Sequence, residues 1–160
     1  MNAILQFCRW CESTQLFSYI SNHEFAFPAL ETVHLFGLAL LLGTLLLLCL
    51  RLLGVILARQ PVAELAGDLA PYTLSGLSLM LTTGVLMFVA TAVRCYGNTS
   101  FWVKMMFLTM ALIFHFAYFR KLLRRDDESI SPARARSAAL GTLVLWFAVG
   151  SAGRAIGFLG

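Results

Sequence analysis

The sequence predicts an all-α integral membrane protein, a bundle of four transmembrane helices preceded by an amphipathic helix at the membrane interface. Of the 160 residues, 59% are hydrophobic and only 12% are charged, which is far too apolar for an ordinary soluble domain. A helix needs about 20 apolar residues to cross a bilayer, and four runs of that kind occupy 27–50, 72–93, 101–119 and 138–159. We therefore expect residues 1–160 to form a single membrane domain.

The segment 1–24 mixes large apolar side chains with polar ones, as an interfacial helix on the outer surface does. Arg9 and Glu12 interrupt its apolar run, so we do not expect a cleaved signal peptide. The segment contains Cys8-Arg-Trp-Cys11, and Cys95 is a possible third member. A C-x-x-C pair can be a redox dithiol, half a metal site or a local disulfide, and simple buried thiols or a structural bridge are the plainer alternative.

The first two spans are predicted from their ends and their small residues. Pro28 suits the first turn of the span at 27–50, which can extend past Arg51 if that side chain snorkels to the interface. Gln60-Pro61 predicts the following turn, and we expect 68–71 to lead into the span at 72–93. That span holds small residues that favour close helix packing in lipid, namely Ser75, Gly76, Ser78, Thr82, Thr83 and Gly84.

The last two spans follow a short outer turn at 95–100, where Gly97-Asn98 tolerates positive φ. The span at 101–119 contains Lys104 and His115. The span at 138–159 contains Arg154 within a face of small residues, which favours packing against protein.

The basic residues predict the orientation. The loop at 120–136 contains Arg120, Lys121, Arg124, Arg125, Arg134 and Arg136. By the positive-inside rule, this loop and the loop at 51–70 are cytoplasmic, so both termini are periplasmic in a bacterial inner membrane. The net charge of +4 sets topology and does not predict a nucleic-acid partner, because the basic residues lie at helix ends without interleaved exposed aromatics.

Ionisable groups at one depth predict a shared site, because such groups are costly inside a bilayer and are functional candidates by default. His34 lies seventeen residues before Arg51 and Lys104 sixteen before Arg120. Arg154 lies eighteen residues after Arg136, and Glu31 lies one turn above His34. We therefore expect an outer-side pocket formed by several helices. Snorkelling of Lys104 and Arg154 to the headgroups, or a purely structural hydrogen bond of His34, is the alternative.

His115 is predicted at a different depth. It lies eleven residues after Lys104, which is about 17 Å farther inward and nearly three whole helical turns, so the two side chains share a face.

These residue types suit haem b. His34 would be the axial ligand, Glu31 would orient it, and Lys104 and Arg154 would neutralise the propionates. His115 would be a second axial ligand, if helix tilt removes the depth difference, or part of an inner-side site. A quinone or porphyrinogen site would use the same groups differently, and a copper path would prefer thiolate and thioether ligands.

The third span also carries a resemblance. Phe101-Trp102-Val-Lys104, followed by His115 and a basic end, resembles the third helix of small haem-containing membrane protoporphyrinogen oxidases. The H-x-x-G of His34 to Gly37 is similar to copper-resistance D-type membrane domains. Over nearly its whole length the chain resembles a family of uncharacterised bacterial four-helix membrane proteins with E-x-x-H-x-x-G, F-x-x-K and G-R-x-I-like motifs. The resemblance implies a haem b site at His34, with His115 as a further ligand candidate and Lys104 as a companion.

Three function classes follow. The first is an inner-membrane haem b protein acting in electron transfer or a membrane-embedded oxidation, as an oxidoreductase subunit with a quinone or other redox partner. The second is a copper or small-solute transport protein, in which Cys8, Cys11 and the methionines would matter as much as His34. The third is a non-catalytic membrane anchor subunit of a homo-oligomer or a larger membrane complex.

Overall fold

The computed structural model describes residues 3–57, 59–124 and 130–159, and every regular element within these residues is a helix. Residues 125–129, in the predicted basic loop, lie outside the described residues. In chain order the elements are α1 (Ala3–Glu12), α2 (Gln15–Asn22), α3 (Ala26–Leu52), α4 (Val62–Ala90), α5 (Ala92–Gly97), α6 (Thr99–Ile113), the π-helix η1 (Phe114–Phe119), α7 (Arg120–Leu123) and α8 (Pro132–Leu159).

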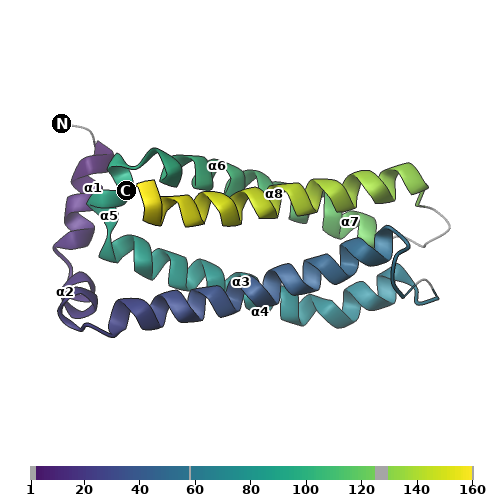
Figure 1. Cartoon of the computed structure of the whole chain (residues 1–160), viewed down its shortest axis with the longest axis horizontal. Helices are drawn as coiled ribbons and strands as arrows, with labels where there is room; N and C mark the ends of the chain where they lie inside the picture. The colour runs from purple at the N-terminus through teal and green to yellow at the C-terminus, as the bar shows by residue number, and fades with distance from the viewer. Residues whose placement is uncertain (1–2, 58, 125–129, 160) are drawn as a thin grey trace.

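The long helices form two antiparallel pairs, α3 with α4 and the α6–η1–α7 helix with α8 (Figure 1). The short helices α1, α2 and α5 lie together at one end, here called the cap end, and the connections from α3 to α4 and from α7 to α8 lie at the other, the loop end. Among the described residues, four helices are long and apolar enough to cross a membrane: Ala26–Leu52, Val62–Ala90, Thr99–Leu123 and Pro132–Ile156. The predicted fold is confirmed, and the chain is a multi-pass membrane protein.

Several helix ends differ from the sequence-based expectation, and α8 begins at Pro132 and not near 138. The second long helix, α4, begins at Val62 and not near 72, and Pro71 lies inside it instead of at its start. Pro61 directly precedes Val62, and a membrane helix tolerates an internal proline because neighbouring groups satisfy the freed carbonyl. The expected turn at 95–100 is largely the short helix α5, which is followed by Asn98 as the N-cap of α6.

The predicted interfacial segment is confirmed as helical but consists of two helices. Thr14 separates them and caps α2, since its hydroxyl oxygen accepts a hydrogen bond from the Phe17 N–H at 3.3 Å. On α1, Cys8 and Cys11 are buried, whereas Phe7 and Trp10 are exposed by more than half of their surface. An exposed apolar face of this kind suits a helix lying at the membrane interface.

Hydrogen bonds tie the cap end to the bundle. Glu12 of α1 accepts a bond from the Val93 N–H at 3.0 Å, at the first turn of α5. The Asn98 side chain caps α6 by accepting from the Ser100 N–H at 2.8 Å, and its amide group donates to the Ile156 carbonyl of α8 at 3.3 Å. The cap end is therefore bonded to the α6–α8 pair, and α2 packs against α3 and α4.

The α3–α4 pair is held by a close backbone crossing. A Cβ atom placed on Gly76 would lie 2.8 Å from the Leu41 nitrogen, and one on Gly37 would lie 3.0 Å from the Met80 nitrogen. Only glycine fits this approach, which is how small residues stabilise helix pairs in lipid. This contact also sets which residues of α4 lie opposite the turn of α3 that precedes Gly37.

Candidate functional site

His34 lies one turn before the Gly37 crossing and contacts α4 through its ring. Its Nδ1 atom is 2.9 Å from Oγ1 of Thr83, and the side chain is half-buried. A Cβ atom on Gly84 would lie 3.4 Å from Cε1 of the ring, so the missing side chain leaves the space in which the imidazole sits. Thr83 and Gly84 together position the ring.

The hydrogen bonds of Thr83 define which nitrogen of His34 carries the proton. Oγ1 of Thr83 is 2.6 Å from the Leu79 carbonyl oxygen, a contact that requires a hydrogen between the two oxygens. A carbonyl cannot donate, so the single hydroxyl hydrogen of Thr83 points to Leu79, and Thr83 must accept from His34. This geometry favours the tautomer with the proton on Nδ1, and a neutral ring of that form keeps its lone pair on Nε2.

Lys104 reaches the same region from α6. Its ammonium group and last methylene would each lie 3.7 Å from a Cβ atom on Gly153, so its side chain runs along the glycine of α8. The side chain is half-buried, and its charge acts on His34. The charge of Lys104 therefore reaches His34 of α3, while its side chain lies against Gly153 of α8.

Glu31 and Arg154 stand at the edge of this region. Both side chains are exposed, and the charge of Glu31 acts on His34 from one turn away. The hydrogen-bond partner of Nδ1 is Thr83 and not Glu31, so the expected orienting role belongs to Thr83 in this structure. Arg154 directly follows Gly153, the residue against which Lys104 lies.

His115 lies elsewhere. It is buried in η1 and lines a cavity near the loop end with Thr73 and Leu74 of α4. Thr73 precedes Thr83, the partner of His34, by ten residues, which is about 15 Å along α4. The two imidazoles are therefore not brought together, and of the two expected roles for His115 this position matches the inner-side site.

The cap end contains three cysteines. Cys8, Cys11 and Cys95 are all free and buried, so the structure contains thiols here and no disulfide between them. Cys8 and Cys11 pack with Ala92 of α5, and Oγ1 of Thr91 is 3.4 Å from Sγ of Cys95. Burial raises the pKa of the Cys8 thiol above its ordinary value, and the neighbouring Cys11 and Cys95 act in the same direction.

Among the described residues, no three or more His, Cys, Asp or Glu side chains lie close enough to share a bare metal ion. The region of His34 instead offers one neutral imidazole nitrogen and one ammonium group between two helix pairs. One imidazole can complete the coordination of a metal that already has most of its ligands from a cofactor. The ammonium group can pair with a negatively charged group.

Sequence reasoning missed the roles of Thr83 and Gly84. Both belong to the run of small residues in the second span, where the pattern predicts packing. The hydrogen bond between Thr83 and His34 has no local sequence signal, because the two residues are 49 positions apart along the chain.

Comparison with known proteins gives a family and no closer relative. No curated protein and no solved structure matches the chain. One family matches residues 7–159, which is nearly the whole chain and includes all four long helices. The chain therefore belongs to the family of unknown function DUF6644.

Proposed function

We propose that this protein binds haem b, with His34 as the axial ligand, and acts in electron transfer or in an oxidation within the membrane. The observation that carries the proposal is the hydrogen bond from Nδ1 of His34 to Thr83. A histidine that ligates a metal typically donates its other ring N–H to a neighbouring acceptor, which fixes the tautomer and the ring orientation.

The donor set fits haem better than a bare ion. Porphyrin supplies four nitrogen ligands to its iron, so one imidazole from the protein is enough. A neutral His34 ring that donates from Nδ1 to Thr83 would keep its lone pair on Nε2, which is the form that ligation requires. The likeness of the third span to the oxidase helix supports the same cofactor.

The charged neighbours would hold the propionates. Lys104 supplies a half-buried ammonium group, and Arg154 lies at the same level on α8. A guanidinium or ammonium group stabilises a carboxylate more strongly in a low-dielectric site than in water. Glu31 would act on the ring of His34 through its charge.

When bound, haem would supply a one-electron carrier, which a quinone or a protein redox partner could reduce or oxidise. We place the loop end in the cytoplasm and both termini in the periplasm of a bacterial inner membrane, because arginines concentrate near the loop end. The site of His34 then lies toward the periplasmic side.

A reduced-minus-oxidised spectrum of the protein, purified in mild detergent from haem-replete cells, tests the proposal. We expect a Soret band and the sharp visible bands of a b-type haem, absent from His34→Ala. His23→Ala is the matched control, since His23 is exposed and bonds the Tyr19 carbonyl of its own helix. A wild-type protein without a Soret band, or His34→Ala with an unchanged one, would overturn the proposal.

A further inference from the structure

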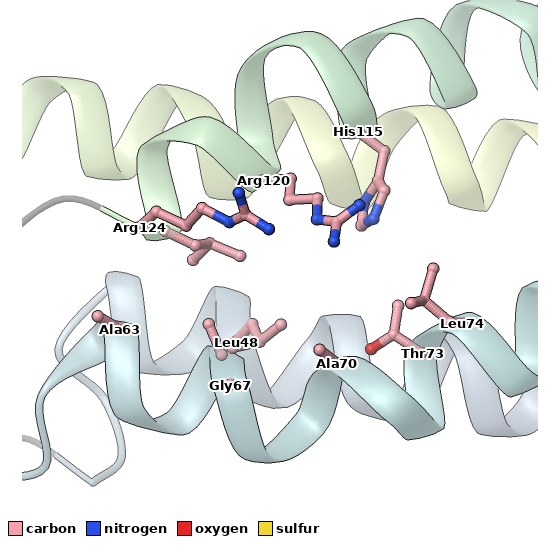
Figure 2. Close-up of a pocket in the computed structure, with 11 residues that line it drawn as sticks. Leu48, Ala63, Gly67, Ala70, Thr73, Leu74, His115, Arg120 and Arg124 are labelled. Carbon is pink, nitrogen blue, oxygen red and sulfur yellow. The ribbon is translucent and has the colours of Figure 1, made fainter.

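A cavity of about 160 Å³ lies near the loop end, between α4 and the η1–α7 segment. Its α4 wall carries small side chains that leave room, including Ala63, Gly67 and Ala70. Across from them, Figure 2 shows His115, Arg120 and Arg124 directed into the space between the helices. No aspartate or glutamate is among the described residues that line this cavity.

The π-helix explains why His115 and Arg120 face the same cavity. In a regular α-helix, residues five apart lie about 140° apart around the axis. Here the Arg120 N–H donates to the His115 carbonyl, an i to i+5 bond that closes a wider turn. Arg120 is thereby brought onto the face of His115, and Arg124 follows one α-helical turn later. Single π-turns within helices are frequent at functional sites.

A second feature that points to a ligand, besides the arginines of the cavity, is the unpartnered nitrogen of His115. The side chain is only 6% exposed, and its Nδ1 atom is buried without a hydrogen-bond partner. A buried polar atom without a partner costs about 1–3 kcal/mol, so such atoms are rare in native proteins unless a ligand or water satisfies them. Within the described part of the chain, no carboxylate forms an ion pair with Arg120 or Arg124.

We infer that this cavity binds a phosphate group. Two guanidinium groups and one imidazole N–H match an anion with several oxygen acceptors. The volume would hold about five water molecules at ~30 Å³ each, which suits a headgroup and not a whole cofactor. The phosphate can belong to an anionic phospholipid, since basic pockets between membrane helices bind such headgroups, or it can be free phosphate. This inference is independent of the haem proposal.

Thermal unfolding of the full chain in neutral detergent, titrated with three probes, tests the inference. The probes are dioctanoyl phosphatidylglycerol, inorganic phosphate and, as the zwitterionic comparison, dioctanoyl phosphatidylcholine. We expect phosphatidylglycerol to raise the melting temperature saturably, and Arg120→Gln and Arg124→Gln each to weaken its apparent binding about tenfold. Lys121→Gln, the matched control, removes an exposed charge next to Arg120 and should leave binding unchanged.

A second variant keeps every charge. Gly67→Leu fills the cavity, and the structure leaves space for its Cβ atom because nothing lies within 4 Å. We expect it to fold and to lose the phosphatidylglycerol response. A response to phosphatidylglycerol alone assigns a lipid headgroup, and an equal response to inorganic phosphate assigns free phosphate. Equal responses to phosphatidylcholine and phosphatidylglycerol in the wild type, or an unchanged response in Arg120→Gln and Gly67→Leu, would overturn the inference.

Discussion

The two buried or half-buried imidazoles of the bundle differ in what holds them. His34 is half-buried, and its Nδ1 atom contacts Thr83 on the neighbouring helix. Its other ring nitrogen, Nε2, is the atom that could bind a metal. His115 is almost fully buried, and its Nδ1 atom has no partner although a cavity with two arginines lies beside it. In our two proposals, the same residue type therefore acts as a metal ligand near the cap end and as a hydrogen-bond donor near the loop end.

This difference comes from the neighbouring helix and not from the histidines themselves. On α4, the surface facing His34 has a hydroxyl and a glycine, Thr83 and Gly84, whereas the surface facing His115 has room but few acceptors. The charged neighbours differ too, because Lys104 acts on His34 and Arg120 acts on His115. The first three predictions below alter the His34 side of this comparison, and the last concerns the thiols of the cap end.

The largest effect is expected from Gly76→Ala. Its new Cβ atom would lie 2.8 Å from the backbone nitrogen of Leu41, so α3 and α4 must separate beside the His34 contact. Overpacking of this kind costs about 1–3 kcal/mol. Thermal unfolding in detergent, followed by circular dichroism, should show a clear drop in melting temperature. Gly43→Ala is the control, since its Cβ atom meets nothing within 4 Å, and equal melting temperatures for the two would contradict the close crossing.

Thr83→Val removes the side-chain hydrogen-bond partner of His34 at nearly constant volume. Loss of a partner of this kind typically weakens metal binding about 10–100-fold, so we expect haem titration to show at least a tenfold higher dissociation constant. Thr83→Ser should restore most of the affinity. The neighbouring Thr82 is exposed, so Thr82→Val serves as the matched control. Equal affinities for Thr83→Val and Thr82→Val would show that the hydrogen bond does not position a ligand.

A smaller effect is expected from Lys104→Met, which removes the ammonium group that lies against Gly153. If this group stabilises a propionate by about 1 kcal/mol, haem affinity falls about fivefold. Lys121→Met makes the same chemical change on the exposed surface of α7 and should leave haem affinity unchanged. The informative quantity is the ratio of the haem affinities of Lys104→Met and Lys121→Met. A ratio near one would exclude Lys104 from the site.

The smallest effect concerns the thiols of the cap end. Because burial raises the pKa of Cys8, its thiolate fraction at neutral pH is below that of a free cysteine, whose pKa is about 8.5. Alkylation of Cys8 by iodoacetamide should therefore be slow near neutral pH and should accelerate only as pH rises above that value. Labelling sites are identified by mass spectrometry, with the unfolded chain as the control. Labelling at neutral pH as fast as in the unfolded chain would contradict the burial.

The sequence predicts the fold well and the partners of the site poorly. The four apolar runs are sufficient to predict four membrane spans, since bilayer thickness sets helix length. The mixture of apolar and polar residues in 1–24 is sufficient to predict an interfacial segment. Counting depth predicts Lys104 level with Arg154, because helix rise is regular, and in the structure Lys104 lies against the neighbouring Gly153. The start of α4 at Val62 escapes this reasoning, since Pro71 is a breaker in water but is tolerated in a membrane helix.

What could not be predicted depends on rotation and on contacts between helices. The π-turn in η1 changes which side chains share a face with His115, and no residue in Phe114–Phe119 signals that turn. The preference of His34 for Thr83 over Glu31 depends on the Gly37 and Gly76 crossing, which sets the register of α3 against α4.

The most direct test of the central claim is the haem content per chain of His34→Ala and His115→Ala, purified in parallel and measured by the pyridine haemochrome assay. The difference between the two imidazoles predicts that His34→Ala loses its haem, whereas His115→Ala keeps a content close to that of the wild type. Loss of haem in His115→Ala with retention in His34→Ala, or equal content in both, would contradict the assignment of His34 as the ligand.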